Sequence, residues 1–230
     1  MTVVISIGGS VLVEDLDHER VLKYASVIKD VIKEMAPSEK VFIVTGGGKV
    51  AREYINAARR FGASEVACDF IGIEVTRLNA SLLVAAIGSI AYPEVPANYR
   101  EAKNAASSSR VVVMGGVAPG QTTDAVSAIL AEYVRAEKLF IATSVDGVYT
   151  ADPKTNPDAR RLPELTPEEL VEIVMKISMG AGSNSPVDPL AAKIIERCRI
   201  HTFVFDGTHP ENIPRAIMGE HIGTDIKPKP

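Results

Sequence analysis

The chain has 230 residues, of which 46% are hydrophobic and 23% charged, and its formal net charge is −4 at pH 7. This composition is ordinary for a globular enzyme, and the net acidity argues against general binding to nucleic acid or to an anionic membrane. We see no apolar run near the ~18 residues that cross a bilayer and no basic leader, so we expect a cytoplasmic protein without a membrane partner.

The first part of the chain alternates predicted strands and helices. A strand is expected at Thr2–Ile7, and Asp17 then caps a helix that Pro37 stops. The apolar stripe of this helix consists of Val21, Leu22, Ala25, Ile28, Ile32 and Met35. A second strand at Lys40–Thr45 precedes a helix that ends at Gly62. Its expected buried face consists of Val50, Ala51, Tyr54, Ile55, Ala58 and Phe61.

A long apolar helical region from about Cys68 to Ala91 follows, and Pro93 and Pro96 break it. The next expected elements are a short helix at 101–106, a strand at 111–114, a helix opened by Thr123-Asp124 and a strand at 139–143.

The last part of the chain begins with an expected hairpin arm, Val145–Thr150, around the turn-favouring pair Asp146-Gly147. An exposed loop is expected at 151–166, and Thr166-Pro167-Glu168-Glu169 is typical of a helix start. A helix bearing Leu190, Ile194, Ile195 and Cys198, a strand at 202–205 and a helix at 210–218 complete the prediction.

Strands separated by helices predict an α/β fold, in which a mostly parallel central sheet carries helices on both faces in a three-layer sandwich. Cys68 and Cys198 are expected to be reduced, buried thiols, and the four histidines show no metal-ligand spacing. His201 is expected to be a core or surface residue rather than a catalytic base.

Three predicted strands end in glycines: Gly8-Gly9, Gly46-Gly47-Gly48 and Gly115-Gly116. Glycine lets the backbone approach an anion closely, and a following helix adds the positive end of its dipole. Three such turns in one chain suggest a site that holds more than one phosphorylated group.

Polar residues follow two of these turns. Lys49 and Arg52 are three residues apart, so both can lean toward one end of their helix and bind phosphate. After the third turn, Gln121, Thr122 and Thr123 offer donors and acceptors to a polar ligand. Asp124 is either a helix cap or a group that orients a lysine or holds magnesium.

The segment from Thr143 to Pro153, with Asp146-Gly147-Val148-Tyr149-Thr150-Ala151-Asp152-Pro153 at its centre, resembles the ATP-binding segment of the amino-acid kinase superfamily. The first two glycine turns stand in the order and spacing of that family, and the resemblance covers nearly the whole chain. It is closest to the archaeal type of uridylate kinase, on the stretches Ile5–Leu12, Asp69–Ile73, Thr76–Ala80 and Val187–Lys193.

The resemblance implies phosphorylation of UMP to UDP by direct in-line transfer from ATP, in pyrimidine nucleotide biosynthesis, with Mg²⁺ carried by ATP rather than by side chains. It implies that ATP is bound by Gly9, Ser10, Gly48, Arg52, Thr143, Ser144, Tyr149 and Asp152. UMP would be held by Gly47, Asp69, Val117, Ala118, Pro119, Gly120, Gln121, Thr122 and Thr123, with Asp69 on the ribose hydroxyls. The implied catalytic residues are Lys193, Asp124, Arg52 and Lys49.

Two positions depart from the family pattern. Ser6 stands where many members have a lysine, so we look to Lys49 or Arg52 for compensation, and Ser144 stands where an asparagine is common. The resemblance also implies one domain with an acceptor lobe (about 1–135) and an ATP lobe (about 136–230), assembled as a homohexamer of three dimers.

Alternatives remain at this point. Acetylglutamate and isopentenyl phosphate kinases share the superfamily, and the fold also serves non-catalytic nucleotide binding or storage. An isopentenyl phosphate site should be apolar beyond the phosphate, whereas Gln121-Thr122-Thr123 is polar. A dinucleotide-dependent dehydrogenase is disfavoured because no Gly-x-Gly-x-x-Gly is followed by an acidic residue ~20 positions later.

Overall fold

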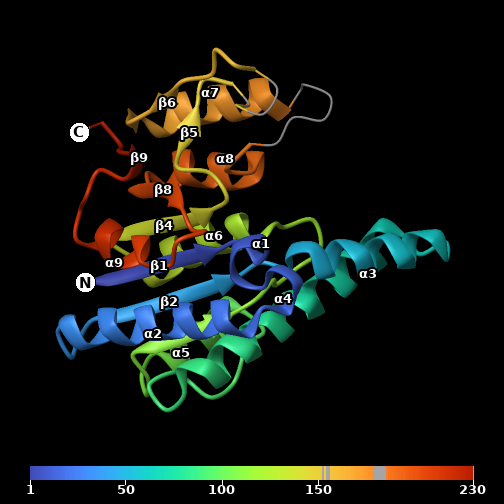
Figure 1. Cartoon of the computed structure of the whole chain (residues 1–230), viewed down its shortest axis with the longest axis vertical. Helices are drawn as coiled ribbons and strands as arrows, with labels where there is room; N and C mark the ends of the chain where they lie inside the picture. Colours follow the sequence, from blue (N-terminus) through green and yellow to red (C-terminus); the bar gives the residue numbers. More distant parts are fainter. Residues whose placement is uncertain (152, 154–155, 179–184, 230) are drawn as a thin grey trace.

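A computed structural model describes residues 1–151, 153, 156–178 and 185–229. Within them, a seven-stranded sheet has the order β3-β2-β1-β4-β8-β9-β7, and β5 and β6 pair separately (Figure 1). The strands are β1 (Thr2–Ile7), β2 (Lys40–Thr45), β3 (Val111–Met114), β4 (Lys138–Thr143), β5 (Val148–Tyr149), β6 (Arg161–Leu162), β7 (Glu164–Leu165), β8 (Thr202–Asp206) and β9 (Gly223–Ile226). All neighbouring pairs in the large sheet are parallel except β8 and β9. The predicted fold class is thus confirmed.

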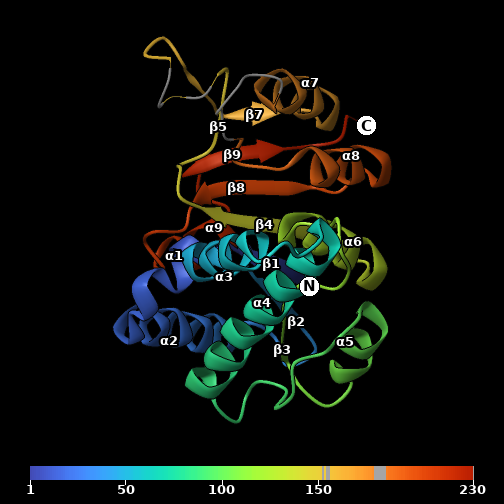
Figure 2. The same ribbon diagram turned by 90° about the vertical axis from the view of Figure 1, so that its right-hand side faces the viewer.

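Helices cover both faces of the sheet, as Figure 2 shows edge-on. The helices are α1 (Gly9–Leu12), α2 (His18–Glu34), α3 (Gly48–Arg60), α4 (Glu65–Ile87), α5 (Tyr99–Ala105), α6 (Thr123–Val134), α7 (Pro167–Ser178), α8 (Pro189–Cys198) and α9 (Asn212–Ile217), with a 3-10 turn, η1, at Glu14–Leu16. Buried side chains of α2, α4 and α9 form one core layer with one face of the sheet, and those of α5 to α8 form the other. The central strands are therefore buried on both faces, which explains their continuous Val and Ile runs.

The register of the sheet brings the strand ends together. Ile7 of β1 pairs with Thr45 of β2 on one side and with Ala142 of β4 on the other. Backbone bonds continue this pairing into the loops: Gly46 donates to the Ile7 carbonyl at 2.9 Å, and Gly8 donates to that of Ala142 at 3.1 Å. Chain order reverses between β1 and β4, so the loops beyond them flank the point where such folds bind ligands.

Helix starts follow the predicted cap chemistry. Asp17 accepts the backbone N–H groups of Glu19 and Arg20 at the start of α2. Thr166 and Glu169 form a reciprocal capping box at α7, with bonds of 2.7 and 3.2 Å.

Several predictions of burial and pairing are wrong. In the stripe of α2, Leu22 is half-exposed while Tyr24 is buried. The outer part of α3 projects from the molecule (Figure 1), and its expected buried residues Tyr54 and Phe61 are 60% and 86% exposed. Cys68 is a buried thiol, as expected, but Cys198 is only partly buried.

Within the expected hairpin arm Val145–Thr150, β5 does pair antiparallel, but its partner is β6, so the connection runs through residues 150–160 and the turn predicted at Asp146-Gly147 is wrong. The expected exposed loop at 151–166 is wrong at its end, where β6 and β7 lie, and β9 was not predicted either. In β9 the Thr224 hydroxyl accepts the Val148 N–H at 2.8 Å and donates to the Leu162 carbonyl. This side chain therefore connects β9 to both strands of the β5–β6 pair.

Helix α4 is, by length and composition, apolar enough to cross a membrane, contrary to the expectation that no segment would be. Core helices of soluble proteins meet the same criterion. Here 44% of its most apolar 18 residues is buried inside the protein, and the helix packs against α2, α3 and β3.

Candidate active site

The first two glycine turns are in direct backbone contact. A Cβ atom on Gly9 would lie 2.1 Å from the backbone nitrogen of Gly48, and one on Gly46 would lie 2.4 Å from that of Gly9. Gly48 also has φ +64°, a conformation that favours glycine. No side chain fits between the two turns, so the loops after β1 and β2 meet as bare backbone.

The helices that leave these turns begin without side-chain caps. The cap positions of α1 and α3 are Gly8 and Gly47, and neither start has a side-chain cap bond. By contrast, the starts of α2, α4, α5, α6 and α8 are capped by Asp17, Ser64, Asn98, Thr122 and Asp188. The first N–H groups of α3 therefore remain available to an anion, with the helix dipole behind them.

Buried polar residues of α4 hold the glycine turns in place. The Asn79 amide donates to the Gly46 carbonyl at 2.8 Å, and the Thr45 hydroxyl donates to the Thr76 carbonyl at 2.9 Å. The Thr76 hydroxyl accepts the Gly116 N–H at 2.6 Å, which ties the third glycine turn to the same helix. These residues were not predicted to belong to the site. The available signal was two polar side chains inside an apolar helix.

The loop after the third glycine turn forms one side of the site. Pro119 and Gly120 (φ +78°) occupy the centre of a turn closed by the Gln121 N–H on the Ala118 carbonyl at 3.3 Å. Asp69 of α4 accepts the Gly120 N–H at 2.9 Å, so two segments expected to hold UMP lie together.

A tyrosine not predicted for the site joins this loop. The Tyr99 hydroxyl, from the first turn of α5, donates to the Gln121 side-chain oxygen at 3.1 Å. Burial raises the pKa of Tyr99 to about 12, so the phenol stays protonated and keeps its donor.

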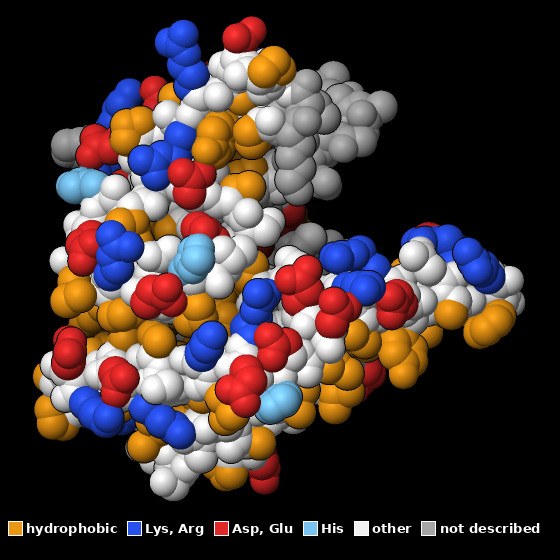
Figure 3. Space-filling view, viewed as in Figure 1, with side chains coloured by type: hydrophobic (Ala, Val, Ile, Leu, Met, Phe, Trp, Pro, Cys, Tyr) orange, Lys and Arg blue, Asp and Glu red, His pale blue; other side chains and the backbone are white. Residues whose placement is uncertain are grey.

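A small cavity beyond the end of β4 forms the other side. Its lining includes three residues expected at ATP, Thr143, Ser144 and Tyr149, together with apolar groups such as Val145 and Ile177. Asp146 accepts the Tyr149 hydroxyl at 2.6 Å, and this bond, with burial, raises the pKa of Tyr149. Asp152 lies outside the described residues. Figure 3 shows the surface hollowed between the projecting α3 and the half of the molecule built on β4 and β8.

Ser6 and Asp124 connect β1 with α6 between these two sides. The Ser6 hydroxyl donates to Asp124 at 2.8 Å. Burial raises the pKa of Asp124 to about 6, the Ser6 bond opposes that shift, and the charge of Asp188 adds to it. The alternative of Asp124 as a helix cap is wrong, because Thr122 caps α6. Among the described residues, Asp124 has no cationic partner.

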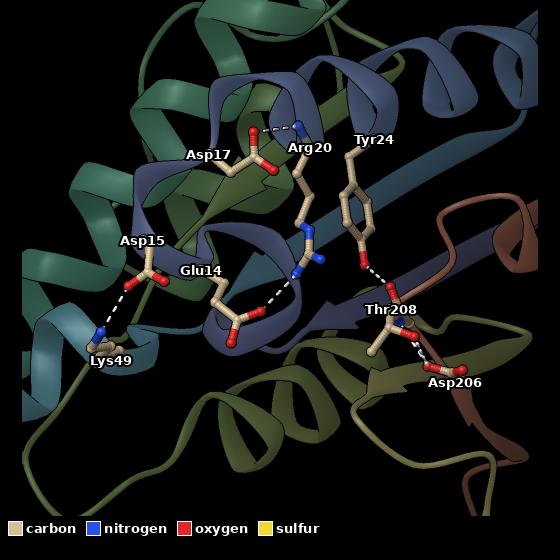
Figure 4. A network of polar contacts seen from close by, with 9 residues as sticks. Glu14, Asp15, Asp17, Arg20, Tyr24, Lys49, Asp206 and Thr208 are labelled. Carbon is tan, nitrogen blue, oxygen red and sulfur yellow. Dashed lines mark hydrogen bonds and ion pairs between the residues drawn. The ribbon is translucent and has the colours of Figure 1, made fainter.

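The expected cations lie at the surface. Lys49 forms an ion pair of 2.7 Å with Asp15 (Figure 4), and Lys193 forms one of 3.0 Å with Glu196. Both lysine side chains are about half-exposed. Arg52 is exposed, and no carboxylate of the described part of the chain pairs with it.

The η1 segment, whose Asp15 pairs with Lys49, has a strained backbone and further polar contacts. Asp15 and Leu16 both have positive φ, at 51° and 56°. Figure 4 shows Glu14 paired with Arg20, and Tyr24 bonded to the backbone between Asp206, at the end of β8, and Thr208. The compensation for Ser6 that we expected from Lys49 therefore requires this lysine to leave Asp15.

Comparisons with known proteins identify the family of the chain. The family model described as "Amino acid kinase family" matches residues 1–206. The uridylate kinase of Methanosarcina mazei is 56% identical over 220 residues, which are 96% of this chain and 93% of that protein.

Two solved structures also resemble this one. The crystal structure of uridylate kinase from Archaeoglobus fulgidus superposes with a TM-score of 0.89 at 50% identity, covering 98% of this chain and 100% of that one. UMP kinase from Bacillus anthracis shares the fold, with a TM-score of 0.82 at 24% identity, covering 100% of this chain and 96% of that one. The chain thus belongs to the amino acid kinase family.

Proposed function

We propose that the protein transfers the terminal phosphoryl group of ATP to UMP, which yields ADP and UDP. The observation that carries this proposal is the backbone contact between Gly9 and Gly46–Gly48. It lies beyond the ends of β1 and β2, with the Asp69–Gly120 loop on one side and the cavity after β4 on the other. Relatives that share half or more of the sequence are named uridylate kinases.

The reaction requires side chains that supply positive charge and hold the substrates in position, and it requires no general base. A phosphate monoester has its second pKa near 6, so UMP is already a competent nucleophile at neutral pH and needs no general base. Two anionic groups must be held in line, and the N–H groups of the glycine turns neutralise part of their charge. Arg52 and Lys193 are the exposed cations that we assign to the transferring phosphates.

We assign Mg²⁺ to the phosphates of ATP. No group of three His, Cys, Asp or Glu side chains with metal-site geometry occurs in the described ranges. The polar groups present fit an incoming ATP–Mg²⁺ complex through backbone N–H donors, and a bound Mg²⁺ would neutralise phosphate charge. Asp124 and Ser6 are further polar groups of the site that we assign to the ATP–Mg²⁺ complex.

A panel of acceptors tests the proposal. ADP release is measured with ATP, Mg²⁺ and each of UMP, CMP, dTMP, acetylglutamate and isopentenyl phosphate, and we expect turnover with UMP above all others. The polar loop at Gln121–Thr123 and the Asp69 carboxylate favour a nucleotide over an apolar acceptor. Activity on a non-nucleotide acceptor, or no activity, would refute the proposal.

Asp124→Asn distinguishes the role of this residue in phosphoryl transfer from its effect on the stability of the protein. The raised pKa means that the folded protein disfavours the carboxylate, so Asp124 reduces stability above pH ~4 and reaches its full cost above pH ~6. We expect the variant to raise the unfolding free energy at pH 8 by roughly 1–3 kcal/mol, a gain that disappears toward pH 4. Phosphoryl transfer should fall about 100-fold.

The measurements are chemical denaturation from pH 4 to 8 and the rate of ADP release. Because Asn keeps an oxygen that accepts the Ser6 hydroxyl, the local geometry is retained. A variant that is less stable than the wild type at pH 8 contradicts this account of Asp124.

We further propose one domain with an acceptor lobe (about 1–135) and an ATP lobe (about 136–230), acting in the cytoplasm in pyrimidine nucleotide synthesis. We also propose self-association through the apolar face of α3, α4 and η1. Leu78, Tyr54 and Leu16 of this face are 58% to 61% exposed, and Figure 3 shows hydrophobic side chains along the lower edge of the projecting arm. The resemblance to archaeal uridylate kinases implies that three such dimers form a homohexamer.

Leu78→Glu tests this face, because Leu78 lines two apolar grooves on it, one together with Tyr54 and one together with Leu82. Light scattering should give a lower mass for the variant than for the wild type, since a charge would be desolvated at each contact. Met218→Glu is the matched control: Met218 is 65% exposed beside α9, on another part of the surface. An unchanged mass for Leu78→Glu would place the contact elsewhere.

A further inference from the structure

The starts of α6 and α8 are joined by one hydrogen bond between their capping residues. The Thr122 hydroxyl accepts the Ala125 N–H at 3.1 Å and donates its own proton to one carboxylate oxygen of Asp188. The other oxygen of Asp188 accepts the N–H groups of Leu190 and Ala191 at 2.8 and 3.2 Å. Each residue thus fixes its own helix and the other one, although 66 positions separate them.

The two joined segments belong to opposite sides of the site. Thr122 lies in the loop whose Gly120 N–H is held by Asp69. On the other side, Ser185 and Pro186 line the cavity after β4 and stand just before Asp188 in the chain. Lys193 follows Asp188 within α8. A displacement of the acceptor loop is therefore passed to the cavity wall and this lysine through this bond, in addition to the packing of α6 against α8 in the same core layer.

We infer that the Thr122–Asp188 bond couples the two nucleotide subsites, with Asp188 as a positioning residue rather than a catalytic one. The inference rests on the proposed function for the identity of the two ligands. A nucleoside monophosphate that orders the acceptor loop orders the start of α8 and the adjoining cavity wall at the same time. Binding of the second nucleotide then costs less conformational entropy, because the residues that line its cavity are already ordered, and its Kd is lower.

The chemistry of the pair suits this role. A bond from a hydroxyl to a carboxylate is charge-assisted and hence stronger than one between neutral groups. The two bonded residues are also the caps of α6 and α8. Neither helix start can therefore move away from the other without losing cap hydrogen bonds. The charge of Asp188 reaches Asp124 as well, two residues after Thr122, which places the link beside the centre of the site.

Calorimetry of two ligands tests the coupling. ADP is titrated into the protein with and without saturating UMP. ADP is chosen because it leaves the place of the transferred phosphoryl group empty and avoids repulsion from the UMP phosphate. In the wild type we expect UMP to lower the Kd of ADP about fivefold or more. In Asp188→Ser, which keeps a cap at α8 but not the link, the factor should fall to about 1 while the Kd of UMP alone is unchanged.

The control is Asp17→Ser, the same change at a residue that caps α2 in the same way and whose side chain, within the described residues, accepts hydrogen bonds only from that helix. It should keep the wild-type coupling. Thr122→Asp also caps a helix, but its carboxylate would face that of Asp188, so we expect it to abolish the coupling. Thr122→Ser keeps both the cap and the hydroxyl donor, so we expect it to retain the coupling. Thermal unfolding of each variant identifies any loss of fold.

The outcomes separate the coupling from the function. If UMP alone gives no heat, the proposed substrate is wrong, and the same titrations are made with the acceptor that the panel identifies. Coupling that is absent in the wild type, or that survives in folded Asp188→Ser and Thr122→Asp, overturns the inference.

Discussion

Replacing Gly9 with alanine is expected to reduce phosphoryl transfer by at least about 100-fold and to lower the unfolding free energy by roughly 3 kcal/mol. The new methyl group would lie 2.1 Å from the Gly48 nitrogen and 2.5 Å from the Gly47 carbonyl carbon. Both contacts are with backbone, so no side-chain rotation relieves them, and the two glycine turns must separate. Steady-state rates and denaturant unfolding measure the two effects.

Gly8→Ala is the matched control, one residue earlier in the same turn. The nearest atoms to a Cβ on Gly8 are the Ala142 carbonyl oxygen at 3.5 Å and Val11 Cγ2 at 3.7 Å, and the φ of −56° suits alanine. We expect its unfolding free energy to stay within about 1 kcal/mol of the wild type. Equal destabilisation of the two variants would show that contact between the turns is not what requires glycine at Gly9.

Asp225→Asn is expected to lower the unfolding free energy by about 3 kcal/mol or roughly 6–12 °C in Tm. Asp225 of β9 is 6% exposed and contacts His201 at 2.6 Å, Lys227 at 2.9 Å and Lys138 at 3.4 Å. The Lys138 ammonium is largely buried against the rings of Phe140 and Phe203. The substitution leaves this charge without its buried counter-charge, whereas replacing a partner at the surface costs little.

The pH dependence follows from the same contacts. Burial alone would raise the pKa of Asp225, but the bonds from His201 and Lys227 and the charge of Lys138 outweigh it and hold the pKa well below its usual range. The stabilisation is therefore fully present above the unfolded pKa of about 3.9 and is lost as the pH falls further. Glu164→Gln is the control, since Glu164 pairs with the same Lys227 but is 62% exposed. A stability difference between the wild type and Asp225→Asn that stays constant down to pH 2 would contradict this explanation.

Much of the fold could be predicted from the sequence because local patterns carry it. The apolar runs of β1, β2, β3, β4 and β8 are continuous because these strands are buried on both faces. Asp17 and Thr166 mark helix starts because their side chains satisfy N–H groups two or three residues away. Strand β9, Gly223–Ile226, has no such pattern, and it exists because β8 offers an edge to pair with.

Burial on α3 could not be predicted, for a related reason. The stripe that includes Tyr54 and Phe61 has helical spacing, as in a helix packed on a core. The outer part of α3 extends beyond the sheet (Figure 1), and these two side chains are exposed. A stripe indicates which face of a helix is apolar but not what covers it.

The sequence by itself determined where the chain turns on glycine, which residues stand at those turns and which family pattern they follow. Only the tertiary structure decided that Ser6 meets Asp124 across 118 positions, that Thr122 meets Asp188 and that Asp225 meets Lys138. Local patterns reflect interactions between residues a few positions apart, whereas these pairs depend on the order of strands in the sheet. That order follows from the packing of the whole chain, so partners at such separations are specified only once the sheet has formed.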